Sequence, residues 1–113
     1  MRKLPFSLAV LGAVAALAVP ALAATKSIKV DDNYYVRSSG VPTVTVKRGD
    51  VVRWDFVGRS PHTVSARGPV RFESRPMTSG RFKKRMTTAG RYKIFCRVHG
   101  AKDMSMVLVV RGG

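Results

Sequence analysis

Cysteine is nearly absent from this sequence, and helical patterning is missing. The 113 residues contain a single cysteine, Cys96, which excludes an intramolecular disulfide. No segment carries apolar residues at the three-to-four-residue spacing of an amphipathic helix. The sequence also has no internal repeat and no low-complexity segment. These absences predict one small domain built without helices.

Acidic residues are scarce as well. Six aspartates and glutamates stand against 21 lysines and arginines, and the formal net charge is +15. A field of this sign steers encounters with acidic partners or anionic surfaces, and salt weakens it. The cations are dispersed, and only residues 81–85 (RFKKR) form a dense cluster. Charge therefore indicates the sign of a partner without identifying the partner.

The first residues resemble an export signal. Arg2 and Lys3 precede the apolar run 8–19, and small residues at 21–23 (ALA) fit a signal-peptidase site. We expect a signal peptide at residues 1–23, cleaved after Ala23, and a periplasmic or extracellular protein.

The mature domain would span residues 24–113 and keep a net charge of about +13. A retained membrane anchor is the competing interpretation of the N-terminus. Pro20 and an apolar run shorter than the ~20 residues of a membrane span weigh against it. We expect no integral membrane span after cleavage.

Short strand-like segments separated by turn residues fill the rest of the chain. Residues 43–56 (TVTVKRGDVVRWDF) contain two of them, and residues 48–50 between them predict a hairpin. In the second segment Val52, Trp54 and Phe56 share one face, as in a half-buried strand. Trp54 is therefore expected in the core.

Three further segments complete the strand pattern. Residues 90–96 (GRYKIFC) alternate in the same way, so that Cys96 ends an inward-facing row. Residues 104–110 (MSMVLVV) predict a packed terminal strand, and residues 28–36 (IKVDDNYYV) suggest a strand pair or a bent strand. Roughly seven short strands at spacings of about 8–12 residues predict an all-β Greek-key sandwich or barrel.

Side chains that bind transition metals are few, and their spacing is informative. The spacing Cys-x2-His-x4-Met places Cys96, His99 and Met104 on one loop between two strands, while His62 arrives from a separate hairpin. Two imidazoles, a thiolate and a weak axial thioether make up a blue-copper electron-transfer site. Taken singly, each residue has a structural explanation, such as a buried cysteine acting as a small hydrophobe. Jointly they favour a metal site, because an exported unpaired thiol is prone to oxidation unless a ligand occupies it.

These motifs resemble the small blue copper proteins, the cupredoxins, of the plastocyanin and pseudoazurin type. The resemblance covers most of the mature domain and rests on five stretches: VKRGDVVRWDF (46–56), SPHTV (60–64), AGRYKIFC (89–96), CRVHGAKDM (96–104) and VLVV (107–110). It implies one type 1 copper per chain.

The resemblance also implies the role of each ligand. His62, Cys96 and His99 would be equatorial, and Met104 would be axial. Met106, two residues further along, is the alternative axial ligand. Plastocyanins have an asparagine that braces the ligand loops after the first histidine, whereas Thr63 stands here. We expect a different brace, and backbone N–H groups, such as that of Thr63, as hydrogen-bond donors to the Cys96 sulfur.

A soluble, monomeric electron carrier that is not an enzyme is the function implied by the resemblance. Its partners would be acidic redox proteins, and electrons would pass through His99 and a docking surface including Val98, Gly100 and Ala101. Copper storage or delivery without electron transfer is the alternative. A third hypothesis is polyanion binding by charge alone, although no specific nucleic-acid partner is expected.

Overall fold

The computed structural model describes residues 23–112, so the predicted signal peptide lies almost wholly outside the described residues. This part of the chain contains no helix, and therefore none with the length and apolar character to cross a membrane. Its strands are β2 (Thr25–Asp31), β3 (Tyr34–Tyr35), β4 (Thr43–Lys47), β5 (Val51–Phe56), β6 (Ser65–Arg67), β7 (Phe72–Glu73), β8 (Gly80–Arg85), β9 (Gly90–Phe95) and β10 (Ser105–Arg111).

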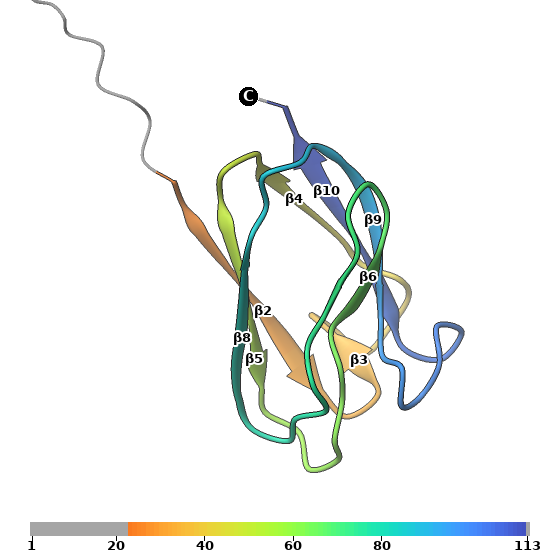
Figure 1. Ribbon diagram of the computed structural model, residues 1–113. Coiled ribbons are helices and arrows are strands. Elements are labelled where there is room, and N and C mark those ends of the chain that lie inside the picture. The colour runs from red at the N-terminus through yellow and green to blue at the C-terminus, as the bar shows by residue number, and fades with distance from the viewer. Residues whose placement is uncertain (1–22, 113) are drawn as a thin grey trace, which may run out of the picture.

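The strands form two sheets that face each other (Figure 1). The five-stranded sheet has the order β4-β10-β9-β6-β7, and the four-stranded sheet has the order β3-β2-β5-β8. Strands β4 and β10 pair in parallel, as do β2 and β5, and the remaining pairs are antiparallel. The predicted all-β Greek-key sandwich with a single domain is confirmed, and so is the strand pair within residues 28–36.

Alternation along the strands builds the core between the sheets. The predicted inward face of β5 is confirmed, because Val52, Trp54 and Phe56 are buried while their neighbours are partly exposed. The Trp54 ring lies 6.1 Å from the Phe72 ring and 5.9 Å from the Phe82 ring, measured between centroids. Strand β9 contributes a second inward row that ends at Cys96. This core places the thiol at the edge of a packed apolar layer.

The hairpin predicted at residues 48–50 is wrong. Strands β4 and β5 lie in different sheets, so the turn between them crosses from one layer to the other. Gly49 makes this crossing with a φ of 99°, and Arg48 N–H donates to the Arg111 carbonyl at 2.7 Å. Each strand buries only one face, and alternation alone does not tell which sheet a strand joins. The segment that carries His62 also crosses between layers, from β5 to β6, rather than forming the expected hairpin.

The carboxylate of Asp50 ties this crossing to the start of β2. It accepts hydrogen bonds from Lys47 N–H at 2.9 Å and Ala24 N–H at 3.0 Å, and these bonds hold the pKa of Asp50 below its ordinary value. A lowered pKa in the folded state stabilises the fold above the ordinary pKa of about 3.9, and this contribution is lost as pH falls through the lowered pKa.

Replacing Asp50 by asparagine is expected to lower the melting temperature at pH 7, with a difference that narrows as the pH falls below about 4. The carboxylate accepts one hydrogen bond at each oxygen, whereas the asparagine side chain has only one accepting oxygen. Protonation of Asp50 at low pH removes the charge that strengthens these bonds, so the two proteins then become more alike. Circular dichroism melts of both proteins across this range measure the effect, with Asp103→Asn as the charge-matched control. A difference that is unchanged at low pH would contradict this role for Asp50.

Candidate metal centre

The residues predicted to bind a metal come from two connections that are far apart in the sequence. His62 lies on the crossing from β5 to β6, Cys96 directly follows β9, and His99 lies on the loop from β9 to β10. These loops lie at the end of the sandwich opposite the C-terminus (Figure 1). The core is therefore closed at this end by side chains able to bind a metal.

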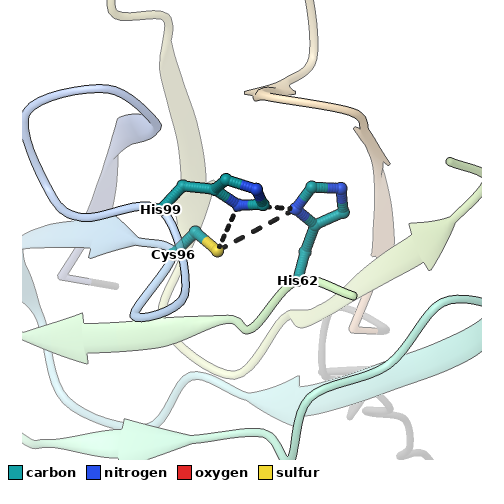
Figure 2. A group of neighbouring side chains, drawn as sticks. All are labelled: His62, Cys96 and His99. Atoms are coloured by element: carbon teal, nitrogen blue, oxygen red, sulfur yellow. Dashed lines mark hydrogen bonds between the residues drawn. The ribbon is translucent and has the colours of Figure 1, made fainter. Parts of the chain in front are cut away.

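Figure 2 shows the three side chains converging on one point. The His62 and His99 Nδ1 atoms are 3.2 Å apart, and Cys96 Sγ lies 3.3 Å from His99 Nδ1 and 3.9 Å from His62 Nδ1. His62 and Cys96 are buried, whereas His99 is partly exposed at the edge of the group. The predicted grouping of these three residues therefore holds in space as well as in sequence.

The spacing of the three donor atoms fits a shared ion. Imidazole nitrogens and thiolate sulfurs bind such ions at about 2.0–2.3 Å, so three of them in one plane around an ion lie roughly 3.5–3.8 Å apart. The observed separations of 3.2, 3.3 and 3.9 Å are within about half an ångström of these values. His62, Cys96 and His99 are thus positioned to hold one metal ion with little movement.

His62 is held on both sides. Its backbone exchanges two hydrogen bonds with Met77, each 2.9 Å long, which form an isolated bridge. Its ring Nε2 lies 2.9 Å from Asp32 Oδ1 in the turn between β2 and β3. Because a carboxylate only accepts hydrogen bonds, Nε2 carries the proton, and Nδ1 presents its lone pair to Cys96 and His99. Asp32 thereby selects the tautomer that a metal ion needs.

Asp32 is a residue of this cluster that the sequence did not reveal. Its carboxylate accepts further hydrogen bonds from the N–H groups of Arg59 and Ser60, both at 3.0 Å. These bonds, led by that of Ser60, and the contact with His62 lower the pKa of Asp32 to about 2. The carboxylate fits because Gly58 has no side chain: a Cβ there would lie 2.4 Å from Asp32 Oδ1. The sequence alone gives no reason to choose Asp32 rather than the adjacent Asp31 as the partner of His62.

Thr63 links the segment of His62 to the segment of Cys96. Its Oγ1 accepts a hydrogen bond from Arg97 N–H at 2.8 Å, and its carbonyl accepts one from the Tyr35 hydroxyl at 2.7 Å. Burial raises the pKa of Tyr35 far above its ordinary value, so the hydroxyl remains a donor. Within residues 23–112, no hydrogen bond joins Thr63 N–H to the Cys96 sulfur. The expected donation from Thr63 N–H to the sulfur is therefore wrong, and Thr63 instead links the two segments through its hydroxyl, while its carbonyl binds Tyr35.

Two methionines separated by Ser105 lie at the end of the loop from β9 and on β10. In the antiparallel register of β9 and β10, Met106 lies opposite Ile94, and Cys96 N–H donates to the Met104 carbonyl at 3.1 Å. Met104 is therefore the cross-strand neighbour of Cys96, whereas Met106 lies one pair deeper in the core. Both side chains are buried.

Three solved structures share this architecture. A mutant of amicyanin in the Cu(I) state is 23% identical, and the match covers 77% of this chain and 82% of that one with a TM-score of 0.64. A purple cupredoxin from Nitrosopumilus maritimus is 24% identical over 75% of this chain and 98% of that one, with a TM-score of 0.61. A mutant plastocyanin of fern is 20% identical over 75% and 99%, respectively, with a TM-score of 0.60.

The chain thus has the fold of the cupredoxins, as its motifs predicted. The sequence itself matches no protein-family model and no curated protein.

Proposed function

We propose that this chain binds one copper ion through His62, Cys96 and His99, with Met104 as the axial ligand, and carries single electrons between redox partners. The convergence of two imidazole nitrogens and one thiol at the end of the core carries this proposal. Thiolate and thioether suit Cu(I), and imidazole suits both oxidation states, so this donor set matches copper better than harder metals. The cupredoxin fold supports the same conclusion.

Bound copper would supply one-electron chemistry by alternating between Cu(II) and Cu(I). The chain's own residues hold the donor atoms in place, exclude water and leave one edge open. His62 and Cys96 are buried, and the core behind them keeps solvent away. His99 is the partly exposed ligand, so an electron would enter and leave at its side, beside Val98, which is 50% exposed.

The test is the optical and paramagnetic spectrum of the mature domain after addition of Cu(II). We expect the intense blue or purple thiolate-to-copper absorption and a reversible midpoint potential. A colourless protein with an unchanged thiol reactivity would reject copper binding. A coloured protein that delivers copper to an acceptor without redox cycling would favour storage or delivery.

Acidic redox proteins are the proposed partners, because the net charge is strongly positive and electron-transfer encounters are weak and salt-sensitive. We also propose that the protein is a monomer. We propose no catalytic role for it, since both histidines of the chain belong to one centre and leave no imidazole for a second site.

Export is part of the same proposal and has a structural consequence. The nitrogen of Ala24 lies 3.0 Å from Asp50 Oδ1. Cleavage after Ala23 would convert this nitrogen to an ammonium group and strengthen its hydrogen bond with the carboxylate. We expect mass spectrometry of the exported protein to show a chain that begins at Ala24. A mass that includes the apolar run 8–19 would instead support a retained anchor.

The axial ligand can be identified by substitution of each methionine. Met104→Leu is expected to raise the reduction potential and to alter the paramagnetic spectrum, because it removes the thioether of the proposed axial ligand and leaves an apolar side chain of similar size. Met106→Leu is the matched control and should leave both properties nearly unchanged. If the Met106 variant alone moves the potential, Met106 is the axial ligand.

A further inference from the structure

The outer face of the five-stranded sheet contains a groove that the proposed metal centre does not use. It has a volume of about 460 Å³ and lies over β6, β9 and β10 and the residue before Pro42. Its apolar lining includes Val41, which is 59% exposed, and Val107 on β10. Lys93 on β9 lies between Arg67 on β6 and Val107 in one cross-strand row. Two cations and one apolar side chain thus lie side by side across the floor.

Three cations line this groove, and none of them is neutralised. Arg67, Arg91 and Lys93 are exposed and take part in no ion pair within residues 23–112. Arg67 is held in position by the Phe95 ring, with its guanidinium carbon 4.5 Å from the ring centroid. A cation that is already fixed loses less conformational entropy when an anion binds.

Carboxylates near the two sheets are paired with cations outside the groove. On the outer side of the four-stranded sheet, Asp55 pairs with Arg53 and Arg81. On β7 of the five-stranded sheet, Glu73 pairs with Arg97 rather than with a cation of the groove. Among residues 23–112, no carboxylate lines the groove itself. The three cations of the groove are therefore available to an acidic partner at a place where a hollow and apolar side chains are also present.

We propose that this groove docks an acidic segment of the partner protein that carries both carboxylates and apolar side chains. The three cations select the carboxylates, and the exposed Val41 and the partly buried Val107 select the apolar side chains. A phosphate backbone would gain little from Val41 and Val107, so the groove fits a protein segment better than a nucleic acid. Lys93 is three residues before Cys96, about 10 Å along an extended strand. A partner held here lies beside the metal centre.

This inference takes the partner's redox role from the proposed function, but the groove can be tested without copper. The probe is a short peptide of alternating glutamate and valine, added to isotope-labelled mature protein and followed by NMR. We expect shift changes centred on β6, β9 and β10 that weaken in ~0.5 M salt. The double substitution of Arg91 and Lys93 by glutamate should lower the affinity roughly tenfold or more.

The matched control replaces Lys83 and Arg85, two exposed cations on β8, by glutamate and changes the net charge equally. It should reduce affinity less than threefold. Equal losses of peptide affinity in both variants, or NMR shift changes centred on the four-stranded sheet, would overturn the proposal that the peptide binds in the groove. Tighter binding of a short DNA duplex at the same residues would overturn the choice of a protein partner. Cys96→Ser should retain peptide binding, so a failure of the copper proposal is distinguishable from a failure of this one.

Discussion

Replacing Cys96 by serine is expected to abolish the intense visible absorption of the copper-loaded protein and to leave at most a weak, pale copper complex. The absorption requires a thiolate bound to copper, and a serine hydroxyl does not ionise to an equivalent ligand. His62 and His99 would remain as nitrogen donors, so residual copper binding is expected to be weaker and to show an ordinary paramagnetic spectrum. Optical absorption and electron paramagnetic resonance of the Cu(II)-loaded variant measure both effects.

A fold control separates this effect from unfolding. Cys96 is fully buried, and an unpartnered buried hydroxyl costs about 1–3 kcal/mol of stability. Ala66→Ser places the same group at another buried position, on β6 opposite Ile94, away from the donor atoms. This variant should lose comparable stability and keep the colour. An intense blue Cys96→Ser protein would show that another residue supplies the coloured ligand.

Sequence patterns predicted the strands well because each strand buries one face. The alternation around Trp54 and the row that ends at Cys96 appear in the structure as expected. The same patterns could not assign strands to sheets. Residues 48–50 look like a hairpin because they join two alternating strands by a short turn, yet the turn crosses between layers. Which sheet a strand joins depends on contacts far away in the chain, such as the parallel pairing of β4 with β10.

The donor residues were predictable for a different reason. Cys96 and His99 are close in the chain, and the chemistry of a thiol near an imidazole limits their possible roles. His62 followed because the chain has only two histidines. Asp32 was not predictable, since it precedes His62 by 30 residues and reaches it only through the turn between β2 and β3. Its identification needs the folded arrangement, in which Gly58 leaves space for the carboxylate.

Independent supports hold the donor atoms, which suits a centre that exchanges electrons. The Met77 backbone and Asp32 hold His62, while the Met104 carbonyl anchors Cys96 through its N–H. Thr63 then joins the two segments through Arg97 N–H. Because these bonds join atoms of the chain only, they would hold the same donor geometry in both oxidation states of a bound copper. Little rearrangement is then needed when an electron moves.

Replacing Asp32 is expected to weaken copper binding and to raise the reduction potential. The Asp32 carboxylate accepts the Nε2 proton of His62, which increases electron donation from Nδ1 and favours Cu(II) over Cu(I). Asp32→Asn keeps the size but removes the charge, and it should lower Cu(II) affinity about tenfold. Asp32→Ala also removes the acceptor and should lower it by up to about 100-fold. Competition titration with a chelator and voltammetry measure the two quantities.

Asp31 supplies a matched control for this effect. It adjoins Asp32, and its carboxylate accepts hydrogen bonds from Asp32 N–H at 2.7 Å and the Tyr34 hydroxyl at 3.1 Å and pairs with Lys29 at 3.7 Å, without contacting His62. The asparagine oxygen can still accept the bond from Asp32 N–H. Asp31→Asn therefore removes the same charge without removing the contact with the ligand, so its potential should shift much less. Gly58→Ala should reproduce the Asp32 effect, because its Cβ would displace the carboxylate. Equal shifts in the Asp31 and Asp32 variants would mean that Asp32 acts through its charge at a distance and does not orient His62.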